Sequence, residues 1–206
     1  MVFMVSVDPA TGGGSSQPAF AVWEVAASGA TLLDCGTVKV KGTTHWKRMR
    51  DLSFALPAAL LNSFGGNAEM LNEIHCVIEG LPPTIGKIGG GNFCNSSSVH
   101  LHHSAAVLCT CLDWASVSEI AVITWKSFLK GVGLFEYYFK DDMNDAIILG
   151  LTYIALQGLP PVELDLRVFK RMFPTSQRTG FPHQAWLDWA VHIHKSREKG
   201  AKKGKK

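Results

Sequence analysis

Three carboxylates stand at the start of an apolar run in residues 140–151, KDDMNDAIILGL. If this run is a helix, Asp142 and Asp145 are three positions apart and lie on nearly the same face. Asp141 and Asp142 are also well placed to cap the helix and to interact with its dipole. Capping explains Asp145 less well, because the sequence is already apolar there. From this stretch alone, capping and metal ligation both remain open.

The pattern of apolar residues predicts the elements that must position these acids. The expected strands are residues 2–7, 18–25, 30–40, 74–78 and 119–124, and the expected helices are residues 44–62, 99–112, 142–157 and 183–194. The segment 81–98 is rich in Pro, Gly and Ser and is expected to form a loop. A three-stranded antiparallel meander followed by two α-connected strands implies an α/β fold with one mixed five-stranded sheet and helices on both faces.

Two further acids come directly after predicted strands. Asp8 follows the first strand, and Glu79 follows the fourth. In sheets with helical crossovers, sites collect at the carboxyl ends of the strands. We expect the first and fourth strands to be neighbours, which would bring Asp8 and Glu79 together. One acid at a strand end is usually a turn residue, but two on adjacent strands beside a helix with two carboxylates is a less common arrangement.

The composition is typical of a folded domain with a basic C-terminal end. The 206 residues are 47% hydrophobic and 18% charged, which argues against disorder. Residues 195–206 contain seven Lys or Arg and one Glu, so the net charge of +3 comes from this end of the chain. Such a run is typical of a solvated tail, and also of an arm that binds phosphates without sequence preference.

Cysteine usage and hydropathy indicate the compartment. The five cysteines form no C-x-x-C pair, which argues against a disulfide scaffold or a zinc ribbon and suits a reducing cytoplasm. The N-terminus lacks the charge and apolar pattern of a signal peptide, and no apolar stretch reaches the roughly 18 residues of a membrane span. We therefore expect a soluble cytoplasmic protein without membrane contact.

Four short motifs, in this order along the chain, resemble the RuvC-type Holliday junction resolvases of the RNase H-like nuclease superfamily, particularly the small phage members. The motifs are VSVDPATGG with Asp8, CVIEG with Glu79, ITWKSFLKGVG with Lys126, and DDMNDAIILGL with Asp142 and Asp145. The resemblance covers roughly residues 1–157.

The resemblance implies a hydrolase of DNA recombination and repair: a Mg²⁺-dependent endonuclease that cleaves Holliday (four-way) or branched junctions, as a homodimer, in a bacterial or phage-infected host cell. It implies four metal ligands that are also catalytic, with Lys126 as a further catalytic residue near the scissile phosphate. These ligands are Asp8, Glu79, Asp142 and Asp145. Two Mg²⁺ ions, with Mn²⁺ as a substitute, would activate the attacking water and stabilise the leaving oxygen. We prefer Asp142 to Asp141 as the ligand, because only Asp142 has the three-residue spacing to Asp145.

The resemblance also suggests how the chain is divided. We expect an RNase H-like nuclease domain over residues 1–158, a C-terminal helical extension over residues 159–194 and a basic disordered tail over residues 195–206. Rival functions are another RNase H-like nuclease, of the ribonuclease H or terminase type, and a non-cleaving protein that binds branched DNA. A small actin-like ATPase is disfavoured, because the chain holds only one such domain.

Other conspicuous residues are expected to have ordinary roles. The glycine run 89–91 lacks the spacing of a nucleotide-binding loop, so we expect no nucleotide cofactor. His100, His102 and His103 are expected at the surface or facing DNA. The six tryptophans are expected to anchor the core or an interface.

Overall fold

The computed structural model describes residues 2–9, 17–42, 44–80 and 104–203. The predicted loop over residues 81–98, the start of the predicted helix 99–112 and the three histidines at 100, 102 and 103 lie outside these ranges. Within them, none of the helices is long and apolar enough to cross a membrane.

Five strands of the described residues form one mixed sheet in the order β3-β2-β1-β4-β5. They are β1 (Val2–Asp8), β2 (Ala19–Ala26), β3 (Gly29–Thr37), β4 (Ile74–Gly80) and β5 (Ser116–Ala121). The first three strands form the antiparallel meander, and β4 and β5 join it in parallel. This confirms the expected sheet, including the pairing of the first strand with the fourth.

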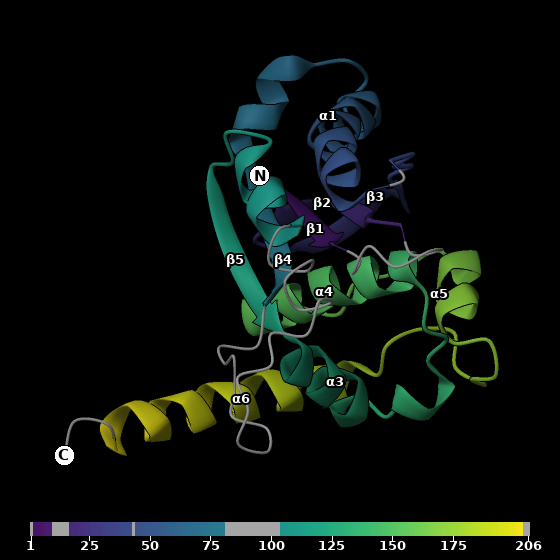
Figure 1. Cartoon of the computed structure of the whole chain (residues 1–206). Helices are drawn as coiled ribbons and strands as arrows, with labels where there is room; N and C mark the ends of the chain where they lie inside the picture. The colour runs from purple at the N-terminus through teal and green to yellow at the C-terminus, as the bar shows by residue number, and fades with distance from the viewer. Residues whose placement is uncertain (1, 10–16, 43, 81–103, 204–206) are drawn as a thin grey trace, which may run out of the picture.

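Helices cover both faces of the sheet, as the sequence predicts (Figure 1). On one face, α1 (His45–Ser63) and the helical residues 104–110 pack over a core that includes Val5, Leu52 and Leu108. On the other face lies α4 (Asp142–Leu156). Beyond α4 lie three further helices, α3 (Val122–Gly131), α5 (Leu166–Met172) and α6 (His183–Lys203), whose aromatic side chains share its core. Short 3₁₀ helices occur at η1 (Ala68–Glu73) and η2 (Phe135–Tyr137).

The structure differs from the sequence prediction where β5 ends. We expected a strand over 119–124, but β5 ends at Ala121 and α3 begins at Val122. The β-branched residues favour a strand locally, whereas the helix buries Trp125, Phe128 and Leu129 at helical spacing against the core. Burial of these large side chains outweighs the local preference.

The C-terminal region is helical and continuous with the core. Trp186 and Trp189 of α6 pack in the same cluster as α3 and α4, so residues on both sides of the expected boundary at 158 share one core. α6 continues to Lys203, past residue 195 where we expected a disordered tail to begin. The residues concerned are mostly Lys, Arg, Glu and Ala, which are good helix formers.

At Gly150, α4 lies closer to the sheet than a side chain would allow. The Ser6 hydroxyl on β1 donates a hydrogen bond to the Ala146 carbonyl of α4 (2.7 Å) and accepts one from the Trp23 indole on β2 (2.9 Å). A Cβ atom at Gly150 would lie 2.3 Å from Trp23 Nε1 and 2.7 Å from Ser6 Oγ. Glycine is otherwise unfavourable inside a helix, so its presence reflects this close approach. The contact sets the position of α4 on the sheet.

We therefore expect Gly150→Ala to lower the free energy of unfolding by about 1–3 kcal/mol, the usual cost of overpacking a core. Alanine is the better helix former, so a purely local effect would have the opposite sign. Urea unfolding of the variant measures the change. Gly180→Ala is the matched control, since nothing lies within 4 Å of a Cβ atom there. A Gly150→Ala protein as stable as the wild type would contradict the close contact.

Candidate active site

Asp8 and Glu79 lie side by side at the ends of adjacent parallel strands. Val7 of β1 pairs with Ile78 of β4, so the two acids directly follow a paired position. Side chains alternate between the faces of a sheet, and Met4 and Val77 belong to the core beneath α4. Asp8 and Glu79 have the same parity as these residues. They therefore project from the α4 face of the sheet, and Asp8 is only 8% exposed.

The three carboxylates at the start of α4 have different roles. Asp141 is the N-cap, and its side chain accepts a hydrogen bond from the Asn144 backbone N–H (2.8 Å). Asp142 Oδ2 accepts one from the backbone N–H of Gln17 (2.9 Å). Asp145 is 5% exposed and takes no part in capping. Capping thus accounts for Asp141, whereas Asp145 is a buried acid in the first turn of the helix and is not its N-cap.

Tyr138 also contacts these acids, although the sequence analysis did not identify it as a site residue. Its hydroxyl donates a hydrogen bond to Asp145 Oδ1 (2.5 Å). Burial, followed by the charge of Asp145, raises the pKa of Tyr138, and Asp141 and Asp8 act in the same direction. The phenol is therefore protonated and donating at neutral pH. No spacing rule could have found it, because Tyr138 reaches Asp145 from the irregular stretch between η2 and α4.

The pKa values of the acids reflect their burial and the negative charges of their neighbours. Burial raises the pKa of Glu79, and the charge of Asp145 raises it further, while Lys140 and Lys126 act in the opposite direction. Burial also raises the pKa of Asp145, as does the charge of Asp142, whereas the Tyr138 hydrogen bond and Lys140 lower it. Strands and helix hold these carboxylates near one another despite their repulsion.

Lys126 and Lys130 lie on one face of α3 beside the end of β4. Both line a cavity of about 620 Å³ that also contacts Gly80, Ile123 and Ser127. Lys126 is close enough to Glu79 to lower its pKa. The structure thus brings a lysine from the predicted set beside the acids, with a second lysine one helical turn further on.

The acids are neighbours, but their side chains are not arranged as a preformed metal site. Among the residues that the structure describes, no three His, Cys, Asp or Glu side chains are close enough together to hold a metal ion as they stand. Their chemistry nevertheless fits one kind of ion. Carboxylate oxygens are hard ligands that suit Mg²⁺ or Mn²⁺ and do not favour softer metals.

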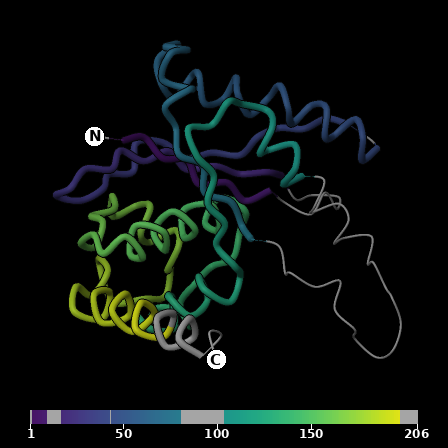
Figure 2. The backbone as a smooth tube through the Cα atoms, turned by 90° about the vertical axis from the view of Figure 1, so that its left-hand side faces the viewer, coloured from purple at the N-terminus to yellow at the C-terminus, as the bar shows by residue number. Residues whose placement is uncertain are grey.

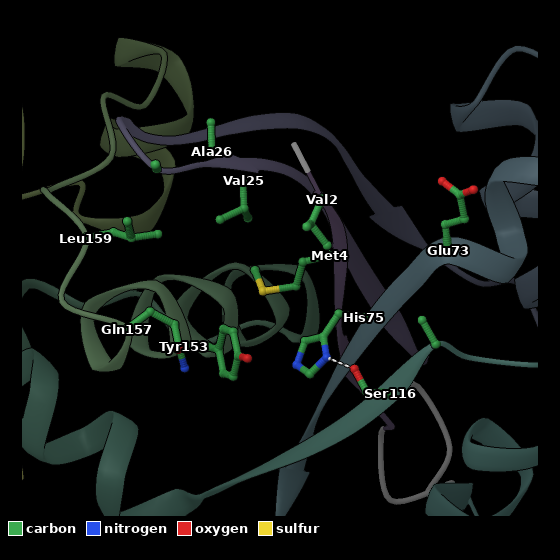
Figure 3. A pocket seen from close by; sticks show the side chains of 12 residues that line it. Val2, Met4, Val25, Ala26, Glu73, His75, Ser116, Tyr153, Gln157 and Leu159 are labelled. Atoms are coloured by element: carbon green, nitrogen blue, oxygen red, sulfur yellow. Dashed lines mark hydrogen bonds between the residues drawn. The ribbon is translucent and has the colours of Figure 1, made fainter.

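A second cavity lies at the other end of the sheet and offers different chemistry. It has a volume of about 450 Å³ and is lined in part by Val2, His75, Ser116 and Tyr153 (Figure 3). His75 Nδ1 shares a hydrogen bond with the Ser116 hydroxyl, and the His75 ring packs 4.9 Å from that of Tyr153. Burial lowers the pKa of His75. Glu73 is the only acid among its described lining residues, so the cluster of carboxylates lies elsewhere.

The comparisons with known proteins concern the fold. No family model matches the chain, and no curated protein matches it. Among solved structures, the chain is similar to a Thermus thermophilus RuvC in complex with Holliday junction substrate, with 14% identity and a TM-score of 0.46. A second Thermus thermophilus RuvC structure has 14% identity and a TM-score of 0.43. Each alignment covers 73% of this chain and 92% of the other. At this level of similarity, any functional conclusion depends on the residues of this chain.

The raised pKa of Asp145 predicts how stability depends on pH without divalent cations. A carboxyl group whose pKa is higher in the folded than in the unfolded protein stabilises the fold most at acidic pH. That contribution is lost as the pH rises from about 4, the ordinary aspartate value, through the raised value. Asp145→Asn keeps an acceptor for Tyr138 but cannot ionise. We expect the variant to melt a few degrees above the wild type at pH 7 in EDTA, with the difference vanishing near pH 4.

Thermal unfolding across this pH range measures the difference. Glu163→Gln, which changes an exposed carboxylate, is the control and should follow the wild type at every pH. A variant that is less stable than the wild type at pH 7 would contradict the electrostatic description of the site.

Proposed function

We propose that the protein is a divalent-metal-dependent endonuclease that hydrolyses phosphodiester bonds in branched DNA, such as four-way junctions. The observation that carries this proposal is the gathering of Asp8, Glu79 and Asp145 from β1, β4 and α4 at one edge of the sheet. Burial and the charge of Asp145 raise the pKa of Glu79, and burial and the charges of Asp142 and Asp141 raise the pKa of Asp145. Groups perturbed in this way are typical of functional sites.

In this proposal Asp8, Glu79 and Asp145, with Asp142 at the rim, hold two Mg²⁺ ions, for which Mn²⁺ can substitute. When bound, the metal supplies Lewis acidity and a water of lowered pKa. The protein's own groups bind and orient. Lys126, beside Glu79, offers a cation to a phosphate oxygen, and the Tyr138 hydroxyl fixes the orientation of the Asp145 carboxylate.

Branched DNA is proposed as the substrate from the resemblance of the four motifs and their order. Recognition would depend on phosphate contacts and on the shape of the junction rather than on base sequence. A four-way junction presents two equivalent strands, so we propose a homodimer in which each protomer cleaves one of them. Such a reaction belongs to DNA recombination or repair.

Cleavage of a labelled synthetic four-way junction tests the activity. We expect paired symmetric nicks with Mg²⁺, none with EDTA, and a loss of more than about 100-fold for Asp8→Asn or Asp145→Asn, since even partners one shell away from a metal are worth 10–100-fold. Junction binding in EDTA should be as tight as in the wild type or tighter, because each substitution removes a negative charge.

The exposed-site variant Glu163→Gln is the control and should cut like the wild type. If a folded Asp8→Asn protein loses binding in step with cutting, Asp8 is not a metal ligand. Parallel reactions with linear duplex and with an RNA–DNA hybrid distinguish a junction resolvase from other nucleases, including those of the ribonuclease H type.

One observation favours a second candidate function, a non-cleaving protein that binds branched DNA. The Tyr138 hydroxyl already occupies one oxygen of Asp145, and among the described residues no three acids are close enough together to hold a metal ion as they stand. In that case Tyr138 would satisfy a buried acid that binds no metal.

Tyr138→Phe separates the two candidates. If Tyr138 orients a metal ligand, removing its hydroxyl should weaken Mg²⁺ binding by about 10–100-fold. If Tyr138 instead blocks the site, the wild type should bind no Mg²⁺ and the variant should gain affinity. Isothermal titration calorimetry with Mg²⁺ measures the binding, and the rise in melting temperature on adding Mg²⁺ gives an independent value.

A further inference from the structure

The segment that leads into α1 and the first turns of that helix carry an unusual set of exposed side chains. Between residues 38 and 54 there are five Lys or Arg residues and one acid, Asp51. The exposed members are Lys39, Lys41, Trp46, Lys47, Arg50 and Phe54, which we call the α1 face. Trp46 is 70% exposed and Phe54 is 73% exposed, whereas the other five tryptophans are buried or nearly so. Of the two roles expected for the tryptophans, core anchor or interface anchor, exposure excludes the core for Trp46.

The two sides of α1 are clearly separated. Met49, Leu52 and Leu56 are buried against the sheet. Trp46, Arg50 and Phe54 recur every four residues, so they form one stripe along the outer side. At 1.5 Å per residue this stripe is about 12 Å long, which corresponds to roughly three to four base pairs of duplex DNA at 3.4 Å each.

Hydrogen bonds connect the start of the α1 face to the candidate active site. The Val40 backbone N–H donates to Gln17 Oε1 (3.0 Å), and the Gln17 backbone N–H donates to Asp142 Oδ2 (2.9 Å). The strands agree with this placement, because Asp8 pairs with Ala19 and Ala19 pairs with Thr37, at the end of β3. In Figure 2, β1 runs away from the N-terminus toward the side of the molecule where α1 begins.

The charge of the α1 face decides what kind of partner it suits. In a two-fold dimer interface the same patch meets itself, so a face that carries Lys47 and Arg50 would meet a second face with the same positive charge. Like charges brought together in this way are unfavourable, and lysine is depleted in protein interfaces. A polyanion has the complementary charge. Exposed aromatic rings beside lysine and arginine are the combination with which proteins bind nucleic acid that has unpaired bases.

We propose that the α1 face binds one arm of the DNA substrate next to the active site. Lys39, Lys41, Lys47 and Arg50 contact successive phosphates of the arm. Trp46 stacks on a base that is unpaired at the branch point. The inference rests on the proposed function, because it assigns the same substrate to a second surface of the protein.

Binding measured in EDTA tests the phosphate contacts without cleavage. The probe is a fluorescent four-way junction, titrated at several NaCl concentrations. Each phosphate contact contributes about 0.9 to the slope of log K against log salt. We therefore expect Lys47→Ala/Arg50→Ala to weaken binding at least 10-fold at low salt and to reduce that slope by about 2. Both side chains are exposed, so the fold should be kept, as circular dichroism can verify.

Arg167→Ala is the matched control for charge. Arg167 is exposed on α5, which packs on the α4 face of the sheet, opposite α1. This variant should bind the junction like the wild type. Equal losses of affinity for Arg167→Ala and for one substitution of the α1 face would mean that any surface cation contributes alike, and would overturn the proposal.

Trp46 is tested by comparing two probes. Trp46→Ala should weaken binding to the four-way junction by about 10-fold, a typical effect of losing one stacked base, and should leave binding to a blunt linear duplex unchanged. Trp46→Phe should restore much of the loss, because phenylalanine also stacks. If Trp46→Ala loses the same affinity for the junction and for the linear duplex, or loses none for either, the proposed stacking role is wrong.

The outcomes separate this inference from the proposed function. If the wild-type protein binds the junction but never cuts it with Mg²⁺, the proposed nuclease activity is wrong. The proposed DNA contact of the α1 face can still be tested by the same binding measurement. A wild type that cuts, with a Lys47→Ala/Arg50→Ala variant that binds equally well, overturns only the inference. If sedimentation shows that Trp46→Ala/Phe54→Ala turns a dimer into a monomer, the face is a protein interface and the proposal is wrong.

Discussion

The contact between α4 and the sheet at Gly150 is the constraint on which the rest of the structure depends. Twelve of the fifteen residues of α4 are buried, so this helix has sheet on one side and α3 and α6 on the other. The hydrogen bond from Ser6 to the Ala146 carbonyl fixes the position of the helix along β1, and the Trp23 indole of β2 donates to the Ser6 hydroxyl. A displacement of one helical turn, about 5.4 Å, would carry Asp145 away from Asp8 and Glu79. The position of Asp145 relative to Asp8 and Glu79 therefore depends on the close packing of Gly150 against the sheet.

The same packing holds the acids together despite the unfavourable electrostatic energy of placing buried carboxylates side by side. A buried carboxylate beside other carboxylates is unfavourable when ionised, and the pKa of Asp145 and of Glu79 is raised for this reason. The aliphatic and aromatic core around α4 supplies the stability that keeps the arrangement. Tyr138, Lys140 and Lys126 reduce the repulsion without removing it. A cation bound among the acids would relieve the remaining repulsion, which is the physical reason for which we propose metal-dependent chemistry.

Gln17 joins the two parts of the molecule to which we assign DNA contacts. Its backbone N–H binds Asp142 at the start of α4, and its side chain binds the backbone of Val40 just before α1. The acids and the basic face of α1 are therefore held at one edge of the sheet by elements on its opposite faces. A substrate that contacts both would be positioned by a rigid scaffold, as precise phosphodiester chemistry requires.

The sequence by itself determined the order of the strands, the main helices on each face and the acids at the ends of β1 and β4, because alternating and helical apolar patterns are local signals. It also indicated Asp142 and Asp145 through their spacing. Only the tertiary structure decided that β5 ends at Ala121 and α3 begins at Val122. It also decided that the Tyr138 hydroxyl donates a hydrogen bond to Asp145 and that Trp46 is exposed. Gln17 and Asp142, 125 residues apart, meet only in the folded chain. Such contacts depend on how whole elements pack, and a local pattern carries no information about which distant residue will fill the remaining space.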